Sequence, residues 1–351
     1  MLSPATTAKA VESSELLNKI LDATKEGVLV VAPGLNIVTA NRPAEQAFRA
    51  PAGSLADRTV NELIDDDDVL TAFVRGCSGE ETTDLHLKLG PKGNRRRYDV
   101  HVAPLELGGE RHAIGFFYDV TQVHRLENIR QVFLSNISHE LRTPLTSILA
   151  FVETLENGGL EDAENNLHFL SVIRRNGERM RDLIADILEL SQIEAGTVSI
   201  DLKEISLSRH VQEIMTNLSS MAAEREIELR NETDPRAMVS ADPKRLEQML
   251  TNLIDNAIRF NRRGGSVTVS DEVSGGRHLI HVADTGEGME PKELPRVFER
   301  FYRVDRSRTR EVGGTGLGLA IVKHLARLHG GEVSAKSELG VGTTFTIDLP
   351  A

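Results

Sequence analysis

The chain has 351 residues, enough for two or three domains, and its hydrophobic content of 40% allows sizeable cores. Its formal net charge of −12 argues against nucleic acid as a direct partner. The single cysteine, Cys77, excludes an intrachain disulfide framework and a cysteine-based metal site. No apolar run approaches the roughly 18 residues of a membrane span, and the first residues lack the pattern of a signal peptide. We therefore expect a cytoplasmic protein without a transmembrane segment, whose recruitment to a membrane would need a partner.

Residues 1–14 are small and polar, and we expect them to be disordered. Residues 15–121 alternate helix-like and strand-like patterns, which predict a helix at 16–21, a helix at 41–48 capped by Asn41, and strands at 27–31, 36–40, 83–89, 97–105 and 112–119. This order resembles a PAS sensory domain, and Asp119-Val-Thr121 is typical of its end before a signalling helix. The resemblance implies an α/β sensor domain. His86, His101 and His112 form no recognisable haem or metal pattern, so we expect them at the surface.

Residues 122–196 have the pattern of a helical hairpin. Apolar residues at spacings of three or four predict a coiled-coil seam at Leu126, Ile129, Phe133, Ile137 and Leu141. Asn157-Gly-Gly159 breaks the first helix, and a second amphipathic helix runs from about 167 to 193 and ends near Gly196. A hairpin is too thin to bury both faces, so we predict a homodimer that forms a four-helix bundle. The alternative is a monomeric hairpin that packs against its own domains.

The most informative segment lies on the first of these helices, at 133–145. It places His139 and Thr143 on one helix face, since residues four apart are neighbours, and puts a carboxylate, Glu140, directly after the histidine. Pro144 follows, although a proline costs an ordinary helix interior roughly 3 kcal/mol. A lone histidine on an amphipathic helix would usually be a plain surface residue. The complete pattern resembles the H-box of the sensor histidine kinases of two-component systems.

Residues 197–351 alternate helix and strand and predict an α/β domain. We expect helices at 242–260 and 320–329, and strands at 266–272, 279–284, 332–337 and 343–349. The whole chain is then a multidomain α+β protein: a PAS-like sensor domain at 15–121, a dimerisation and phosphotransfer hairpin at 122–196, and an ATP-binding domain at 197–351.

The first motif of the last domain is Asn252-Leu-Ile-Asp-Asn256-Ala-Ile-Arg259-Phe260. It resembles the N-box of the GHKL ATPase superfamily, which histidine kinases share with gyrase, a heat-shock chaperone and the mismatch-repair protein MutL. Asn252 and Asn256 lie one turn apart, so their amide oxygens can converge on Mg²⁺ and phosphate, with Asn256 as the metal ligand. The family more often has Lys-Tyr where this chain has Arg259-Phe260, but arginine keeps the positive charge. A buried polar pair on a helix is the structural alternative.

Two further motifs resemble the G1 box and the F-box. In Asp284-Thr-Gly286-Glu-Gly288-Met289, a carboxylate at a strand end can accept a hydrogen bond from the adenine amino group, and the glycines allow the backbone to approach the base. The segment from Phe298 to Arg303 leads into a polar loop to residue 311 that is similar to a nucleotide lid. We expect Tyr302 and Arg303 to contact ATP, with Arg303 at the terminal phosphates.

The last motif, at 313–320, resembles the G2 box. Its glycines expose backbone N–H groups, and the helix that follows offers its N-terminus to phosphate. It is neither a Rossmann fingerprint, because of its glycine spacing, nor a Walker A loop, because no Gly-Lys-Ser/Thr follows. Together with the segment 340–344 it adds these expected ATP-binding residues: Gly314, Thr315, Gly316, Leu317, Gly318, Leu319 and Thr344.

The resemblance covers residues 122–351 and implies a mechanism. His139 would attack the γ-phosphate of ATP, Glu140 would hold its other ring nitrogen, and the phosphoryl group would pass to an aspartate of a response regulator. Thr143 would position a water for dephosphorylation of that partner. ATP and Mg²⁺ are the implied cofactors, and a homodimer and a cognate response regulator the implied assemblies.

The run 301–324 is similar to phosphate-regulon sensor kinases of the PhoR type, which usually carry a PAS domain beside the kinase core. They also usually carry an N-terminal membrane segment, which we do not find in this sequence. This likeness implies phosphate-transport-associated signalling proteins as further partners. Two other classes remain open: a pseudokinase scaffold, which would lack a motif residue, and another GHKL ATPase or serine kinase, which would lack the histidine-bearing hairpin.

Overall fold

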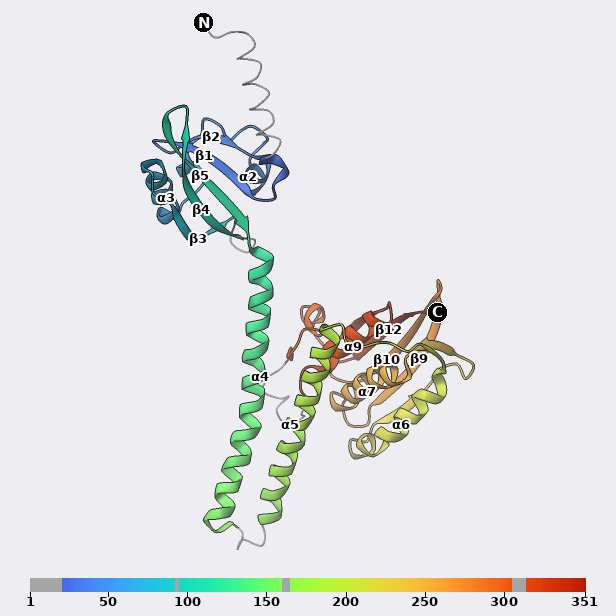
Figure 1. The fold of residues 1–351 in the computed structure, drawn as a ribbon. Helices are drawn as coiled ribbons and strands as arrows, with labels where there is room; N and C mark the ends of the chain where they lie inside the picture. The colour runs from blue at the N-terminus through green and yellow to red at the C-terminus, as the bar shows by residue number, and fades with distance from the viewer. Residues whose placement is uncertain (1–20, 92–94, 160–164, 305–313) are drawn as a thin grey trace. The chain divides into compact units, whose positions relative to one another are not determined.

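The computed structural model describes residues 21–91, 95–159, 165–304 and 314–351, which form two compact units, 1–132 and 133–351 (Figure 1). The disorder expected at 1–14, nearly all of the helix expected at 16–21 and the lid-like loop to residue 311 lie outside the described residues. Among the described residues, no helix combines the length and the apolar character needed to cross a membrane.

The first unit contains a five-stranded antiparallel sheet in the order β2-β1-β5-β4-β3. Its strands confirm the predicted ones to within a few residues: β1 (Gly27–Ala32), β2 (Asn36–Ala40), β3 (Thr82–Leu89), β4 (Arg96–Leu107) and β5 (Glu110–Asp119). The short helix α2 (Arg42–Ala47) is also confirmed, and the side chain of Asn41 accepts a hydrogen bond from the Ala44 N–H at 3.0 Å. The predicted strands thus form one PAS-like sheet, and the helix capped by Asn41 follows its second strand.

Helix α3 (Asp67–Ser78), which sequence analysis did not predict, covers this sheet. Its residues Val69, Ala72, Phe73 and Gly76 are buried at helical spacing. Phe73 packs so closely on Gly115 of β5 that a Cβ there would lie 2.4 Å from the ring. The prediction for His112 was wrong, because its side chain is buried at 8% exposure beside this core.

The helical hairpin consists of α4 (Thr121–Thr154) and α5 (Asn166–Glu194), as predicted. A π-helical turn, η2 (Leu155–Gly159), ends α4, where Asn157 leaves helical geometry and Gly158 adopts a positive φ of 106°. At its beginning, the Thr121 N–H donates to the Asp119 side chain at 3.0 Å. The Asp119 side chain thus satisfies the first N–H group of the helix that follows the PAS-like sheet.

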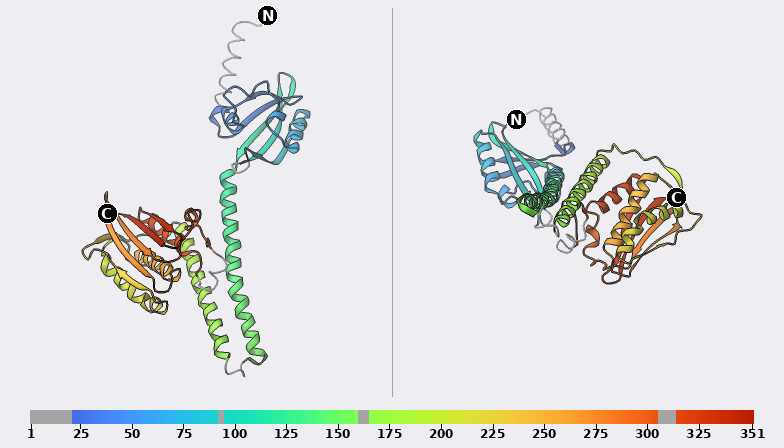
Figure 2. Two further views of the ribbon diagram at one scale, coloured as in Figure 1. Left: turned by 180° about the vertical axis from the view of Figure 1, so that it is seen from behind. Right: turned by 90° about the horizontal axis from the view of Figure 1, so that it is seen from below.

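A second sheet, in the order β11-β12-β10-β9-β7, carries the C-terminal domain. Three helices pack on one face, α6 (Leu207–Glu224), α7 (Pro243–Arg259) and α9 (Gly318–Leu328), which Figure 2 shows from two further sides. The strands are β7 (Glu228–Asn231), β9 (Ser266–Ser274), β10 (Arg277–Asp284), β11 (Glu332–Glu338) and β12 (Gly342–Pro350), and a separate pair joins β6 (Lys203–Ser206) to β8 (Met238–Ala241). Of these elements, α6 and β6 to β8 were not predicted.

The core of this α/β sandwich is aliphatic. Leu246, Met249, Leu250, Leu253 and Ile254 of α7 are fully buried against the sheet, because they repeat at spacings of three and four. Strands β9, β10 and β12 supply alternate buried valines, isoleucines and leucines. Helix α7 therefore has one firmly held apolar side, and its polar residues remain at the rim.

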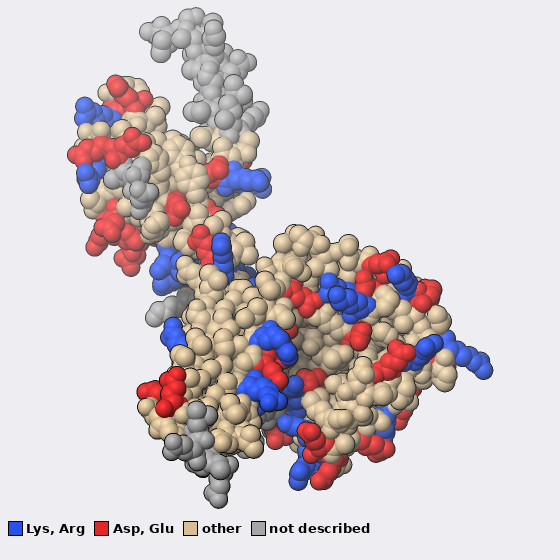
Figure 3. Space-filling model, turned by 60° about the horizontal axis from the view of Figure 1, so that its bottom comes forward, with Lys and Arg blue, Asp and Glu red and all other residues tan. Residues whose placement is uncertain are grey.

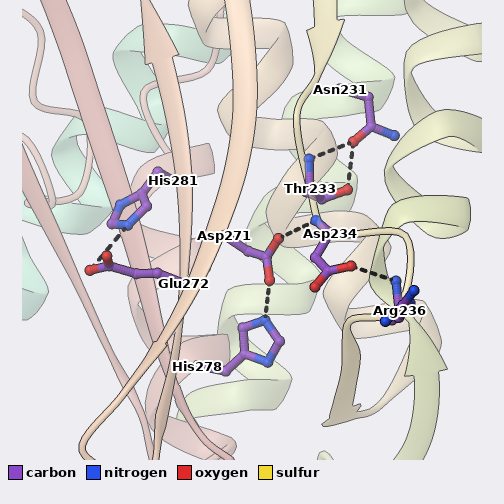
Figure 4. Close-up of polar contacts among 8 residues, drawn as sticks. All are labelled: Asn231, Thr233, Asp234, Arg236, Asp271, Glu272, His278 and His281. Carbon is purple, nitrogen blue, oxygen red and sulfur yellow. Dashed lines mark hydrogen bonds and ion pairs between the residues drawn. The ribbon is translucent and has the colours of Figure 1, made fainter.

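A buried ionisable pair joins β9 to β10 away from the nucleotide motifs (Figure 4). The Asp271 and His278 side chains are 4% and 2% exposed, and the ring Nε2 lies 2.9 Å from the carboxylate. The other oxygen of Asp271 accepts the Asp234 N–H at 2.8 Å. This contact ties the segment between β7 and β8 to the sheet, so we assign the pair a structural part.

Candidate nucleotide and phosphoacceptor site

The H-box residues lie in the middle of α4. His139 and Thr143 are both exposed, and the Thr143 hydroxyl donates to the His139 carbonyl at 3.3 Å. Pro144 is the buried residue of this turn, and it leaves the Glu140 carbonyl without its usual helical donor. The helix thus presents an imidazole and a hydroxyl to solvent on one face while the proline faces inward.

The Glu140 carboxylate is held by arginines. It accepts a hydrogen bond from Arg179 of α5 at 3.1 Å and lies 3.9 Å from a guanidinium nitrogen of Arg303. Among the described residues no hydrogen bond joins Glu140 to the His139 ring, because neighbouring helix positions point about 100° apart. The orienting role expected of Glu140 stays a prediction.

The N-box lies on the C-terminal half of α7. Asp242 caps this helix by accepting the Arg245 N–H at 3.1 Å, and Pro243 occupies its first turn. Asn252 and Asn256 are half-buried beside the fully buried Leu253 and Ala257. Both amides therefore stand at the edge of the core, where a rigid helix positions them.

Arg259 and Phe260 end the N-box helix in different environments. The Arg259 guanidinium bonds to Asp255, one turn earlier, at 2.7 Å. Phe260 is 46% exposed although it is a large aromatic residue. An exposed ring beside the predicted base site is available for stacking, whereas Arg259 already has a carboxylate partner.

The G1 box begins where β10 ends between β9 and β12. Asp284 Oδ1 accepts the Gly286 N–H at 2.8 Å and the Thr343 N–H at 3.2 Å. Burial raises the pKa of the Asp284 carboxyl, and these two backbone bonds partly oppose the rise. Both bonds use Oδ1, which leaves Oδ2 to accept a hydrogen bond from a ligand such as an adenine amino group.

Two glycines make this turn possible. A Cβ on Gly286 would lie 2.5 Å from the Phe260 carbonyl oxygen, and one on Gly288 would lie 2.0 Å from the Glu338 carbonyl oxygen. Gly288 also has a φ of 67°, which residues with side chains rarely adopt. The chain therefore approaches Phe260 closely at the edge where a base would bind.

The F-box and G2 box are joined through their backbones. The Phe301 N–H donates to the Gly316 carbonyl at 2.8 Å, and Thr344 lies on β12 opposite Ala283 of β10. The Tyr302 hydroxyl donates a hydrogen bond to Glu293, and its contact with ATP stays a prediction. Arg303 has a side chain that is 12% exposed. The two motifs thus bring an arginine close to the start of α9.

Residues 314–319 form the entry to α9. Gly314 is exposed, Leu317 is buried, and Leu319 is half-buried in the first turn. The Thr315 hydroxyl accepts the Leu317 N–H at 3.2 Å. A Cβ on Gly318 would lie 3.4 Å from the Asn252 side-chain oxygen, so the G2 box and the N-box are in contact. The N-terminus of α9 therefore lies beside Asn252.

These residues fit a nucleotide with a divalent cation. They combine an acceptor at the end of a sheet strand, an exposed aromatic ring, amide oxygens on a helix and the N-terminus of a second helix. The sequence-based set omitted Thr343, whose N–H reaches Asp284 because β12 pairs with β10 in antiparallel register. It also omitted Asp186 of α5, which bonds to Thr315 and gives no signal in the sequence beyond its place on an amphipathic helix.

Comparison with known proteins places this geometry in a family. Residues 241–351 match the Histidine kinase-, DNA gyrase B- and HSP90-like ATPase family, residues 129–196 match the His Kinase A (phospho-acceptor) domain, and residues 21–125 match the PAS fold. The chain is 32% identical over 350 residues to the sensor-like histidine kinase SenX3 of Mycobacterium tuberculosis strain H37Rv, covering 99% of this chain and 83% of that relative. The chain therefore belongs to the sensor histidine kinases.

Two further proteins resemble this chain, one in sequence and one in fold. The chain is 34% identical over 330 residues to the sensor histidine kinase WalK of Bacillus subtilis strain 168, covering 92% of this chain but 51% of WalK. It thus spans about half the length of that relative. A crystal structure of histidine kinase ThkA in complex with response regulator protein TrrA has the same fold, with a TM-score of 0.52 and 20% identity over 95% of this chain and 97% of that one. None of these likenesses bears on the predicted link to a phosphate regulon.

Proposed function

We propose that this chain is an ATP-dependent protein-histidine kinase that phosphorylates itself on His139 and then passes the phosphoryl group to an aspartate of a response regulator. The observation that carries the proposal is an exposed His139 on a helix of the phosphoacceptor family, in the same compact unit as the glycine-lined Asp284 site. A signalling scaffold would need only the hairpin, and an ATPase would need only the nucleotide site, whereas a histidine kinase needs both.

The chemistry proposed for the chain uses its own side chains as follows. A ring nitrogen of His139 forms a bond to the γ-phosphorus as the bond to the departing ADP oxygen breaks. Asp284 Oδ2 and the Phe260 ring hold the adenine, and Arg303 meets the terminal phosphates. Asn256 would hold Mg²⁺, and the bound ion would offset charge on the transferring group. In the second step a regulator carboxylate oxygen attacks the phosphorus, and the bond to the His139 nitrogen breaks.

The hairpin supports a homodimer as the working assembly. Its helices expose large apolar side chains, including Leu145 and Leu149 of α4 and Leu167, Leu170 and Leu188 of α5, the last three 73%, 46% and 58% exposed. A second hairpin would bury them in a four-helix bundle. Light scattering of the purified chain should give twice the 38.6 kDa mass, and a monomer at micromolar concentration would contradict this part.

The defining experiment incubates the chain with γ-labelled ATP and Mg²⁺ and treats the product with acid and with alkali. We expect label that is lost in acid and kept in alkali, as for a phosphorus–nitrogen bond. Acid-stable label would indicate a serine kinase instead. Bound nucleotide without any label would indicate a scaffold.

The phosphate-regulon role is the narrower part of this proposal. Its support is the likeness of the run 301–324 to kinases of the PhoR type. Transfer of label from this chain to the regulator of a phosphate regulon, at least tenfold faster than to an unrelated regulator, is the expected result. Equal rates would leave the kinase assignment intact and contradict the phosphate-regulon role.

A further inference from the structure

Helix α5 meets the ATP-binding layer through a row of carboxylates. Glu189 accepts a hydrogen bond from Arg245 of α7 at 2.5 Å, and Glu194 forms an ion pair with Arg300 of the F-box. Between these contacts Leu190 and Ile193 are buried in the same core as α7 and α9. Figure 3 shows acidic and basic side chains next to each other where the hairpin meets this layer. The helix is thus packed firmly enough to hold particular carboxylates in place.

One carboxylate of this row, Asp186, contacts the G2 box. Its Oδ2 accepts a hydrogen bond from the Thr315 hydroxyl at 2.6 Å, and the same hydroxyl accepts the Leu317 N–H. The hydroxyl is therefore fixed between the start of α9 and α5. Burial raises the pKa of Asp186, and the charges of Glu189 and Asp182 add to the rise, while the bond from Thr315 opposes it.

A second carboxylate from the hairpin faces the other group assigned to phosphate. Glu140 lies 3.9 Å from Arg303, which is largely buried, and Arg179 holds the same oxygen at 3.1 Å. Two carboxylates of the hairpin, Glu140 and Asp186, thus lie against Arg303 and Thr315. The proposed function assigns both of these residues to the phosphate groups of ATP. An anion cannot approach either group without the repulsion of a nearby negative charge in a partly buried place.

We propose that Asp186 is a determinant of nucleotide affinity, acting as a carboxylate stand-in for a phosphate at Thr315 that ATP must displace from the G2 box. The inference rests on the proposed function of residues 314–319. Because linkage is reciprocal, a contact that excludes ATP weakens ATP binding by the same factor by which ATP weakens the contact. Asp186 therefore affects ATP binding through its contact with Thr315, and it takes no part in the phosphoryl transfer.

The test measures the affinity of the full chain for the ATP analogue AMP-PNP with Mg²⁺ by calorimetry. Asp186→Asn keeps an oxygen that can accept the Thr315 hydrogen bond and removes the charge. We expect it to bind AMP-PNP at least fivefold more tightly than wild type, at the low end of typical coupling between sites. Asp182→Asn is the matched control, since Asp182 lies one turn earlier on α5, is 61% exposed and contacts Arg181. Its affinity should stay within twofold of wild type.

The outcomes separate the inference from the function on which it rests. Unchanged or weaker binding by Asp186→Asn would overturn the inference, as would equal tightening by Asp182→Asn, which would indicate a general effect of net charge. Absence of AMP-PNP binding by the wild-type chain would instead overturn the proposed ATP site. Asp186→Ser is the second variant if the asparagine variant fails to fold, and the same tightening is expected of it.

Discussion

The phosphoacceptor helix and the nucleotide site are built in opposite ways. Thirteen consecutive residues of α4, at 133–145, carry the acceptor His139, the neighbouring carboxylate of Glu140 and the hydroxyl of Thr143. The mutual positions of these groups follow from helix geometry. The nucleotide site instead collects Asn252, Asp284, Arg303 and Gly318 from four segments that meet through packing. A local helix tolerates changes at its exposed positions, whereas an assembled site depends on close backbone contacts. The substitutions below test that difference.

The largest effect is expected at the acceptor. His139→Gln should abolish phosphoryl labelling, because no other nitrogen takes its place, and should leave ATP affinity nearly unchanged, because the side chain is exposed on α4. Labelling with γ-labelled ATP and calorimetry with AMP-PNP measure the two properties. His124→Gln is the matched control on the same helix and should label normally. Acid-labile label remaining in His139→Gln would point to a different acceptor.

The next effect is expected in the assembled site. Asp284→Asn should weaken ATP binding by about 1.5–3 kcal/mol, the usual worth of a hydrogen bond to a charged group. The amide would present N–H₂ to the adenine amino group or to the Gly286 and Thr343 N–H donors. Asp348→Asn, on β12 beside Arg277, is the control and should leave nucleotide affinity unchanged. Equal affinities for wild type and Asp284→Asn would remove Asp284 from the site.

A smaller and more selective effect is expected at Thr143. Thr143→Ala should keep autophosphorylation within about threefold while slowing dephosphorylation of the partner, because its hydroxyl lies on the His139 face and takes no part in the attack on ATP. Alanine is a good helix former, so the backbone should persist. The measurement is the decay of purified phosphorylated regulator in the presence of ADP, with Thr146→Ala, also exposed on α4, as the control. Loss of autophosphorylation would assign Thr143 to the kinase step instead.

The smallest effect concerns the pH dependence of stability. Burial raises the pKa of Asp186 in the folded chain, so its contribution to stability is present below the ordinary aspartate pKa of about 3.9 and is lost as pH rises through the raised value. The free energy of unfolding of Asp186→Asn should therefore increase relative to that of wild type as the pH rises from acidic values to 7. Thermal unfolding across that range measures the difference, with Asp182→Asn for comparison. A stability difference between Asp186→Asn and wild type that does not change with pH would mean that Asp186 has the same pKa in the folded and the unfolded chain.

Much of the architecture could be read from local patterns. The strands of the PAS-like sheet, both hairpin helices and helix α7 were predicted to within a few residues, because alternation, apolar periodicity and caps such as Asn41 and Asp242 act over a few neighbours. Helices α3 and α6 were missed although they carry the same kind of signal. Their buried residues, such as Val69 and Phe73 or Val211 and Met215, repeat at spacings of three and four.

The sequence by itself determined the order of the motifs, the exposed face shared by His139 and Thr143, and the glycines that the nucleotide site requires. Only the tertiary structure decided which partners these residues have. The Thr343 N–H reaches Asp284, 59 positions earlier in the chain, through the register of β12 on β10. Glu140 of α4 and Asp186 of α5 face Arg303 and Thr315 because the helical hairpin packs on the ATP-binding layer. Helix geometry relates residues a few positions apart, but contacts between distant segments depend on how whole elements pack, which no local pattern encodes.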